Sequence, residues 1–186
     1  MQRIVVVGTS GAGKTTLARR IAKRREAPCI EMDSLHWGPN WTEVPPEALR
    51  VSVAAAVSGD AWVLDGNYTM VRDLTWARAD TIVWLDYPRS VVMRRVLWRT
   101  ARRMVTRERL WKAQNVERLG TTLFSRESII WWAWSTYGRR RAEFTSLLLD
   151  SPPSHLRVVR FTKPREAERW LAQLPCNGGR ASQPAW

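Results

Sequence analysis

Cysteine is scarce in this sequence, and long apolar runs are absent from it. Only two cysteines occur among the 186 residues, Cys29 and Cys176, and they form no C-x-x-C pattern. This argues against a disulfide scaffold or a zinc site, and it indicates a reducing, cytoplasmic setting. The first apolar run, residues 4–7, is short, and a glycine-rich loop follows it at once. We therefore expect no signal peptide, no membrane-spanning segment and no membrane partner.

Acidic residues are also in short supply. There are 17 Asp and Glu against 30 Lys and Arg, almost all of the latter Arg, so the formal net charge is +13. Such a charge attracts nucleotides, phosphorylated substrates and nucleic acids without choosing among them. The length and the hydrophobic content of 45% are those of one α/β domain with a hydrophobic core. Twelve tryptophans are unusual, and we expect most of them to line the core or a substrate pocket.

What the sequence does contain is a phosphate-binding loop. Residues 8–15 read Gly-Thr-Ser-Gly-Ala-Gly-Lys-Thr and match the pattern G-x-x-x-x-G-K-[ST] at every fixed position. The β-branched run 4–7 before the loop predicts a buried parallel strand, and the segment 16–25 behind it has apolar residues at helical spacing. Strand, glycine loop and helix together distinguish this motif from a chance glycine turn before a helix.

Each residue type in the loop has a chemical role. Glycines let the backbone fold around a phosphate with its N–H groups pointing inward, and the next helix aims its positive end at the same place. We expect Lys14 to reach the β- and γ-phosphates of ATP, and the hydroxyl of Thr15 to bind Mg²⁺. The predicted nucleotide-binding residues of the loop are Gly8, Thr9, Ser10, Gly11, Ala12, Gly13, Lys14, Thr15 and Thr16.

Strand and helix patterns alternate along the rest of the chain. Further strands are predicted at 28–33, 61–65, 81–86 and 156–161, and further helices at 46–58, 90–105, 127–149 and 164–174. This alternation predicts an α/β fold, a parallel sheet of five strands with helices on both faces, whose ligands bind at the carboxyl ends of the strands. Residues 175–186 are small and polar, and we expect them to form a flexible tail.

Two acidic residues follow apolar runs and are candidates for the acid beside a metal ion. Asp65 leads into an open Gly-Asn turn, whereas Asp86 precedes Tyr-Pro and could simply begin the next helix. We favour Asp65, together with Thr15, as the Mg²⁺ site. The alternative is that either acid only caps a turn.

A pair of acids lies at the end of the second predicted strand. Glu31 and Asp33 are two residues apart, so they would share one face of that strand. Asp33 is the better candidate to orient or deprotonate a hydroxyl group or to add a metal contact, whereas Glu31 could equally be a solvated strand end. The Leu-His-Trp of residues 35–37 offers an aromatic wall and a donor suited to an uncharged or ring-bearing acceptor. His36 could be a catalyst or a packed histidine.

Arginines recur on one face of the helix predicted at 90–105. Arg95, Arg99, Arg102 and Arg103 follow helical spacing, and like charges so close repel one another unless an anion is near. We expect Arg95 and Arg99 to neutralise charge on a phosphate during its transfer. A solvated face or a patch for nucleic acid are the alternatives. Weaker candidates for anion binding are Arg72, Arg126 and residues 139–141.

With these motifs in this order, the sequence resembles the adenylate-kinase-like group of small P-loop kinases, and most closely the DNA topology modulation (FlaR-like) proteins. The segments that carry the resemblance are 8–15, 33–37, 62–68, 84–89 and 126–129. The resemblance implies a three-layer P-loop NTPase sandwich with strand order 2-3-1-4-5, in a single domain of residues 1–174. It also implies a helical insert on the acceptor side at about 34–60 and a helical lid at about 104–125.

The resemblance also implies roles for single residues. In nucleotide kinases of this group the third strand leads into D-G-F-P-R, and here Asp65 is retained while the arginine is not. Arg95 and Arg99 match arginines that follow the fourth strand, and the segment 162–164 would lie near the adenine. The spacing of the two acids after the second strand is similar to that in shikimate- and gluconate-kinase-like enzymes, which phosphorylate hydroxyl groups.

The first hypothesis is an ATP- and Mg²⁺-dependent phosphotransferase that acts on a small-molecule acceptor, either a nucleotide or a hydroxyl metabolite. Its catalytic residues would be Lys14, Arg95, Arg99 and Asp33. The second hypothesis is an ATP-binding regulator that binds DNA and modulates its topology, without metabolic kinase activity. No helix-turn-helix or zinc pattern supports sequence-specific reading of DNA, so the net charge predicts only weak, non-specific binding of nucleic acid.

Overall fold

Five parallel strands form the centre of the molecule. In this computed structural model, which describes residues 1–106 and 129–176, the strands are ordered β2-β3-β1-β4-β5, and each pair of neighbours is parallel. The strands are β1 (Arg3–Gly8), β2 (Cys29–Glu31), β3 (Trp62–Asp65), β4 (Thr81–Leu85) and β5 (Arg157–Phe161). The predicted parallel sheet and its strand order are confirmed.

The three central strands are buried along almost their whole length. Every residue of β3 and β4 is buried, and so are the four inner residues of β1. A strand that is covered on both faces has no polar side, which explains the unbroken apolar run at residues 4–7. The outer strands differ, since β2 is only three residues long and β5 exposes two arginines.

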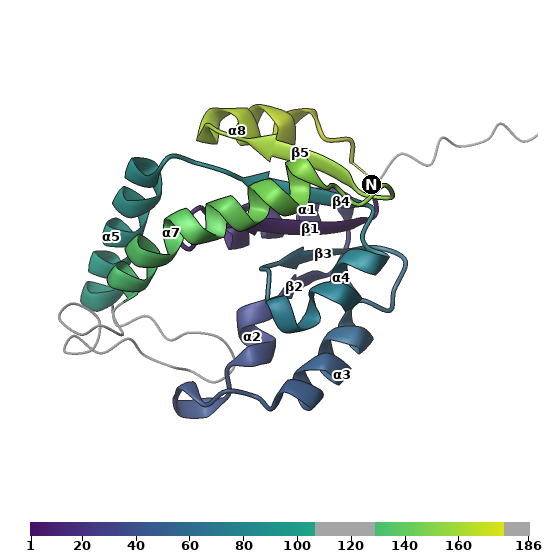
Figure 1. Ribbon diagram of the computed structural model, residues 1–186, viewed down its shortest axis with the longest axis horizontal. Helices are drawn as coiled ribbons and strands as arrows, with labels where there is room; N and C mark the ends of the chain where they lie inside the picture. The colour runs from purple at the N-terminus through teal and green to yellow at the C-terminus, as the bar shows by residue number, and fades with distance from the viewer. Residues whose placement is uncertain (107–128, 177–186) are drawn as a thin grey trace, which may run out of the picture.

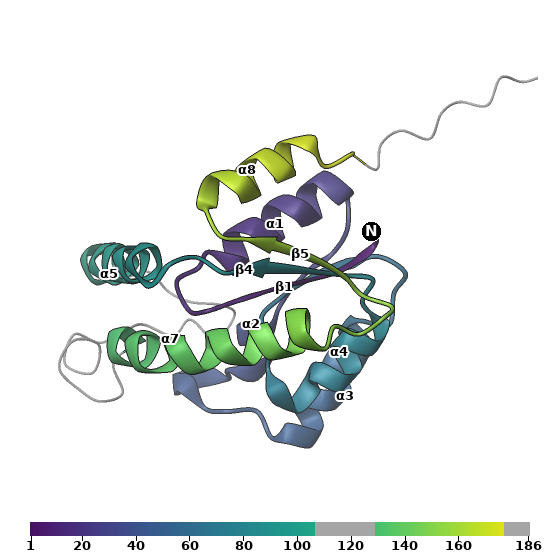
Figure 2. The same cartoon turned by 45° about the horizontal axis from the view of Figure 1, so that its top comes forward.

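Helices cover both faces of the sheet and give the molecule three layers (Figures 1 and 2). Helices α1 (Lys14–Arg25) and α8 (Pro164–Gln173) lie on one face, and α3 (Pro46–Ala56) and α4 (Arg72–Arg78) on the other. Helix α5 (Arg89–Thr106) lies beyond the edge at which the strands end, and α7 (Ile129–Thr145) begins beside it and runs back along the face of the sheet that α3 and α4 cover. The shorter elements are α2 (Met32–His36), η1 (Pro39–Trp41), η2 (Thr69–Val71) and η3 (Ser146–Asp150), a π-helical turn that continues α7.

The sheet divides the hydrophobic core in two. On the side of α1 and α8, Val6 and Val83 belong to a cluster with Ile21 and Leu171. On the side of α3 and α4 the cluster contains large aromatic rings, and the indole of Trp84 lies 6.0 Å from the ring of Phe144 at the end of α7. This second cluster joins the end of α7 to the face of the sheet that α3 and α4 cover, although α7 begins beside α5.

The tryptophans are less buried than expected. Trp62, Trp76 and Trp84 belong to the core. Among the residues that the structure describes, the exposed tryptophans are Trp41, Trp98, Trp131, Trp132 and Trp134. Our expectation that most tryptophans line the core or a pocket is therefore wrong for a large share of them.

The segment after β2 differs from the prediction of a strand over 28–33. The strand ends at Glu31 and α2 begins at Met32, where Ser34 Oγ donates to the Glu31 carbonyl at 2.7 Å. The buried residues here are Met32 and His36, which are four apart and so follow a helical rather than a strand period. Glu31 and Asp33 therefore do not share a strand face.

Of three further predicted segments, one is described throughout and two only in part. The insert predicted at 34–60 contains the end of α2, η1 and α3. The lid predicted at 104–125 and the tail predicted at 175–186 lie mostly outside the described residues. Among the helices of the described ranges, none combines the length and the hydropathy that a membrane crossing requires.

Asp80 ties together the beginnings of β1 and β4. Its carboxylate accepts hydrogen bonds from the backbone N–H groups of Gln2 at 2.7 Å and Arg3 at 2.9 Å, and from the hydroxyl of Thr81 at 2.8 Å. Burial disfavours the charged form of Asp80, but these bonds outweigh burial and lower its pKa.

We predict that Asp80→Ala lowers the free energy of unfolding by about 2 kcal/mol at pH 7, because three hydrogen bonds are lost. Since the pKa of Asp80 is lower in the folded state, its contribution is complete above the unfolded pKa of about 3.9 and is lost as pH falls through the folded pKa. Urea unfolding curves of the two proteins should therefore converge below about pH 4. Asp60→Ala, in an exposed turn, is the control and should change little. A gap that is equally wide at pH 3 and pH 7 would contradict this role.

Candidate active site

The phosphate-binding loop joins β1 to α1 at the carboxyl edge of the sheet. Gly13 is the N-cap of α1 and has a φ of 95°, a conformation that glycine adopts without strain. Helix α1 has no side-chain cap and no acidic residue in its first turn. Its first N–H groups are therefore available to an anion, and the helix dipole favours negative charge at this end.

Gly11 allows the loop to pack directly against α5. A Cβ atom at this position would lie 2.3 Å from Cγ2 of Val96 and 3.1 Å from the carbonyl oxygen of Val92, and Gly11 also has a φ of 84°. The loop backbone thus lies on the surface of α5 with no room for a side chain between them. Helix α5 therefore fixes the position of the loop by packing against its backbone.

Lys14 lies over the loop that precedes it. Its ammonium group donates to the carbonyl of Thr9 at 3.3 Å, and the N–H of Ala12 donates to the same carbonyl at 3.1 Å. Thr9, Ser10 and the two later glycines are half-buried, Ala12 is buried and Thr16 is exposed. The predicted loop residues are thus brought together, with Thr16 at the outer edge of the group.

Asp65 lies next to the loop, at the end of β3. It is 7% exposed and is paired in register with Val6 of β1. Burial raises the pKa of Asp65, and the Lys14 ammonium and Thr15 hydroxyl oppose that rise. Its Oδ1 atom is buried and has no hydrogen-bond partner in the described part of the chain. Asp65 is thus adjacent to Thr15 and has an oxygen atom that remains free for a ligand.

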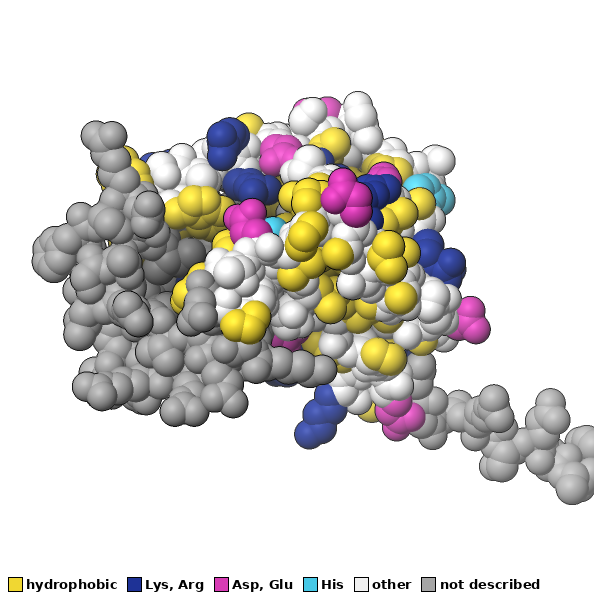
Figure 3. All heavy atoms as spheres, turned by 90° about the horizontal axis from the view of Figure 1, so that it is seen from below, with side chains coloured by type: hydrophobic (Ala, Val, Ile, Leu, Met, Phe, Trp, Pro, Cys, Tyr) yellow, Lys and Arg dark blue, Asp and Glu magenta, His cyan; other side chains and the backbone are white. Residues whose placement is uncertain are grey.

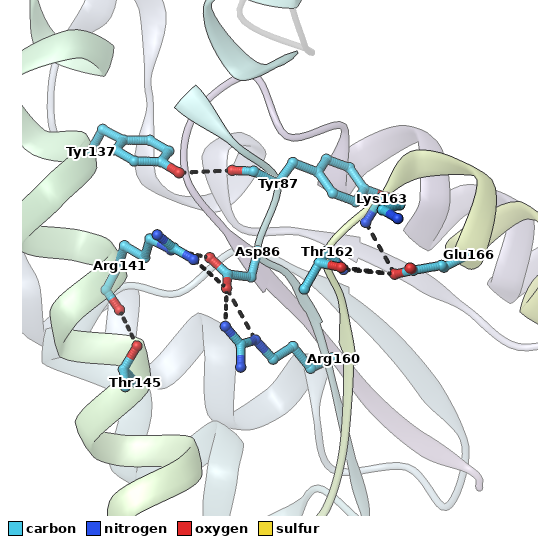
Figure 4. Close-up of polar contacts among 9 residues, drawn as sticks. All are labelled: Asp86, Tyr87, Tyr137, Arg141, Thr145, Arg160, Thr162, Lys163 and Glu166. Atoms are coloured by element: carbon cyan, nitrogen blue, oxygen red, sulfur yellow. Dashed lines mark hydrogen bonds and ion pairs between the residues drawn. The ribbon is translucent and has the colours of Figure 1, made fainter. Parts of the chain in front are cut away.

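Asp86, the alternative acid, is held by two arginines instead. Arg141 of α7 donates to it at 2.7 Å through Nε, and Arg160 of β5 donates through Nε at 3.0 Å (Figure 4). Asp86 is buried, and its charge is compensated by these two cations, one from α7 and one from β5. Of the two candidates, only Asp65 lies beside Thr15.

Arg95 reaches the loop from α5. Its Nη1 donates to the carbonyl of Ala12 at 2.6 Å, and its guanidinium lies 5.2 Å from the centre of the Tyr87 ring. Burial raises the pKa of Tyr87 to about 12, so the ring stays neutral beneath the cation. Arg99 follows one helical turn later and is half-buried, whereas Arg102 is exposed.

Asp33 lies on the first turn of α2 and faces the chain that follows β3. Its Oδ1 accepts a hydrogen bond from the hydroxyl of Tyr68 at 2.6 Å. Burial and the charge of Asp33 raise the pKa of Tyr68. His36 packs against the Tyr68 ring at 4.8 Å and is 6% exposed. Glu31 is separate from this group, since it pairs with Arg19 of α1 at 2.6 Å.

The weaker arginine candidates are engaged elsewhere or lie outside the described residues. Arg72 donates to Glu143 of α7 and to the side-chain oxygen of Asn67. Arg141 pairs with Asp86, and Arg140 lies 3.9 Å from Glu143. Arg126 and the side chain of Arg103 are not among the described parts of the chain. Arg72 and Arg141 therefore join α7 to other elements, whereas the contact of Arg140 lies within α7.

The turn between β5 and α8 is stabilised by Glu166. Its Oε2 accepts hydrogen bonds from the N–H groups of Thr162 at 2.9 Å and Lys163 at 3.0 Å (Figure 4). These bonds, that of Lys163 first, lower the pKa of Glu166. The turn predicted by resemblance to lie near an adenine is thus a fixed capping box at the start of α8.

Three residues next to the site had no predicted role. Tyr68 holds Asp33, Tyr87 supports Arg95, and Arg160 holds Asp86. Tyr68 and Tyr87 could have been identified from the sequence, because each closely follows a candidate acid, Asp65 or Asp86. Arg160 carried none, because its partner lies 74 residues away.

Solved structures share this fold. The chain is similar to a shikimate kinase from Bacteroides thetaiotaomicron, with a TM-score of 0.54 and 17% identity over 92% of this chain and 95% of that one. It is also similar to a shikimate kinase from Acinetobacter baumannii in complex with shikimate, with a TM-score of 0.52 and 14% identity over 93% and 90%. A gluconokinase from Sinorhizobium meliloti 1021 matches with a TM-score of 0.49 and 19% identity over 92% of each chain.

The chain therefore has the fold of the small P-loop kinases. At these identities the likeness shows the fold and not the substrate. No protein-family model matches the sequence, and no curated protein does. These comparisons do not show the resemblance to the FlaR-like subgroup.

We predict that Gly11→Ala lowers the free energy of unfolding by about 2 kcal/mol, because the new methyl group must displace Val96 and the backbone is strained at a positive φ. Gly59→Ala is the control, since a Cβ there would lie 4.0 Å from its nearest neighbour. Urea unfolding of both variants measures the difference. Equal stability of Gly11→Ala and wild type would show that the loop is not packed against α5.

Proposed function

We propose that this protein is an ATP- and Mg²⁺-dependent phosphotransferase that acts on a small molecule. The observation that carries the proposal is the group formed by the loop, Lys14, Thr15 and Asp65 at the carboxyl edge of a P-loop kinase sheet. Backbone N–H groups and one ammonium group there suit a triphosphate. The small-molecule kinases that share the fold add support.

The residues present fit a magnesium ion. Asp65 Oδ1 is a buried oxygen without a partner among the described residues, and the Thr15 hydroxyl lies beside the same carboxylate. In the described ranges no group of three or more His, Cys, Asp or Glu side chains could hold a metal ion by itself, at this site or at any other. Thr15 and Asp65 would therefore hold Mg²⁺ together with phosphate oxygens. When bound, the ion would neutralise charge on the β- and γ-phosphates.

The remaining residues have roles that follow from their positions. Lys14 would bind the β- and γ-phosphates, and the loop amides would orient the triphosphate. Arg95, held by the Tyr87 ring and the Ala12 carbonyl, would stabilise charge on the phosphate in transit, with Arg99 behind it on α5. Asp33 would accept a hydrogen bond, and then the proton, from the acceptor hydroxyl.

No specific observation favours the alternative of a DNA-binding regulator. On the face seen in Figure 3, Lys and Arg side chains stand apart and alternate with Asp and Glu, so they form no continuous basic surface there. Some surface arginines are paired with acids of the same chain, as Arg20 is with Glu168 and Arg50 with Asp73. We therefore propose no second function.

Lys14→Ala should lower ATP turnover by at least about 100-fold, because it removes a cation aimed at the phosphates. Lys23→Ala is the matched control: it removes the same charge from the exposed last turn of the same helix and should leave turnover unchanged. Transfer from γ-labelled ATP to compounds of a metabolite extract measures turnover, and calorimetry measures Mg·ATP binding. If both variants keep wild-type binding and turnover, the proposed function is refuted.

Asp65→Asn should impair the use of Mg²⁺ but stabilise the metal-free protein. It should raise the Mg²⁺ concentration needed for half-maximal turnover by at least about 10-fold. It should also raise the free energy of unfolding of the metal-free protein at pH 7. Because the folded pKa of Asp65 is raised, its charged form costs stability as pH rises above the unfolded pKa, and neutral Asn avoids this cost.

Asp86→Asn separates the two acids. It removes the carboxylate that pairs with Arg141 and Arg160, so it should lower the free energy of unfolding and leave the Mg²⁺ requirement as it is. Magnesium titrations of turnover and urea unfolding give both quantities. A shifted Mg²⁺ requirement in Asp86→Asn, with none in Asp65→Asn, would reverse our assignment of the metal-side acid.

A further inference from the structure

Two loops form a corner beside the proposed metal site. The chain after β2 forms α2, which carries Asp33 and His36, and the chain after β3 carries Asn67 and Tyr68. Strands β2 and β3 are neighbours whose ends are in register, so this corner lies next to Asp65. We define the acceptor corner as Asp33, His36, Trp37, Asn67 and Tyr68.

Negative charge prevails in the acceptor corner. Asp33 is close enough to Asp65 for its charge to act on that carboxyl group, and so is Glu31. Three arginines of the surrounding helices have a carboxylate partner: Arg19 has Glu31, Arg50 has Asp73 and Arg72 has Glu143. Two like charges about 5 Å apart, at an effective dielectric constant of about 20, lower affinity roughly 200-fold. A negatively charged acceptor would meet this repulsion.

Two buried polar atoms of the corner lack a hydrogen-bond partner in the described part of the chain. They are Nδ1 of His36 and Nδ2 of Asn67. The other ring nitrogen of His36 is 3.9 Å from the carboxylate of Glu43, which is too far for a hydrogen bond. Buried polar groups are normally satisfied in folded proteins, so these atoms indicate a ligand that offers oxygen atoms to a donor.

Aromatic rings form one wall of the corner. Trp37 contacts the His36 ring edge-to-face at 4.7 Å, and Trp41 contacts Trp37 in the same way at 5.8 Å. The Tyr68 ring also contacts His36, at 4.8 Å between ring centres. Such walls bind the apolar face of a ring, while the carboxylate and amide beside them bind its hydroxyl groups.

From this combination we propose that the acceptor is a hydroxyl compound that carries no negative charge and presents a ring face to Trp37 and Tyr68. The inference rests on the proposed phosphotransferase function and narrows its substrate class. It separates this protein from kinases whose acceptor is an anion held by unpaired arginines.

The reaction balances without a further reactant. The acceptor hydroxyl donates a hydrogen bond to Asp33, whose Oδ1 is already fixed by Tyr68. The hydroxyl oxygen forms a bond to the γ-phosphorus of ATP, and the bond from that phosphorus to the β,γ-bridging oxygen breaks. The hydroxyl proton passes to Asp33 and then to water, and the products are ADP and a phosphate ester.

The test uses the full chain and a metabolite extract divided by anion exchange. One fraction holds compounds without negative charge and the other holds anions such as sugar acids, sugar phosphates and nucleoside monophosphates. Each fraction is incubated with the protein, Mg²⁺ and γ-labelled ATP, and labelled products are identified by mass spectrometry. We expect the labelled ester to come from the first fraction, with at least about 100-fold more product than from the second.

Two variants tie the result to the corner. Asp33→Asn keeps the shape of the side chain and removes its charge, so it should reduce phosphate transfer to the uncharged acceptor. It should also reduce, by about 10-fold, the ratio of the rate with this acceptor to the rate with its anionic analogue. A purely structural role would lower both rates alike. Glu47→Gln, an exposed carboxylate in the first turn of α3, is the control and should leave both rates unchanged.

The outcomes separate this inference from the proposed function. If Mg·ATP binds and the acceptor comes from the anionic fraction, the inference is wrong and the phosphotransferase assignment stands. If Mg·ATP does not bind, the proposed function fails first. If Mg·ATP binds but neither fraction gains phosphate, both are overturned.

Discussion

The rest of the site depends on one constraint: glycines let the backbone of the phosphate loop lie directly against α5 and β4. Gly11 lies against Val92 and Val96 of α5, and a Cβ atom at Gly8 would lie 2.8 Å from the carbonyl oxygen of Leu85 in β4. The loop backbone is thus fixed by direct contact with the Val96 side chain and the Leu85 carbonyl. Arg95 can bond the Ala12 carbonyl because α5 is held at this distance, and Asp65 lies beside Thr15 because β3 pairs with β1.

A second set of contacts fixes α7 relative to the sheet. Asp86 binds Arg141 of α7 and Arg160 of β5, and Tyr137 donates to the carbonyl of Tyr87 at 2.9 Å (Figure 4). Asp86 and Tyr87 immediately precede α5. The same short stretch therefore anchors α7 and leads into the helix that supports the phosphate loop.

Local patterns in the sequence were sufficient for the sheet and for the loop. Buried strands such as β4 read as apolar runs, and the glycine motif has its strand and helix on either side. The order of the strands came from resemblance rather than from the residues. The turn from β2 into α2 was missed because Glu31 and Asp33 fit a strand as well as a helix, and only the burial of Met32 and His36 distinguishes the two.

Long-range pairing is what the sequence could not provide. Nothing local marks Arg160 as the partner of Asp86, or Glu143 as the partner of Arg72. The stripe of arginines on α5 could be recognised from its spacing, but the bond of Arg95 to the Ala12 carbonyl could not, because the two residues are 83 positions apart. The tryptophans misled for the same reason, since residue type cannot indicate which side of a helix will be covered.

Some of the arginines on α1 bind carbonyl oxygens rather than acids, and this has a practical consequence. Arg24 bonds the carbonyls of Ala172 and Leu174, and Arg25 those of Pro175 and Met1. Carbonyl groups carry no formal charge, so these bonds leave the positive charge of both arginines unneutralised on the folded protein. The purified chain will retain cellular polyanions at low ionic strength, and a wash with concentrated salt must precede any measurement of nucleotide affinity.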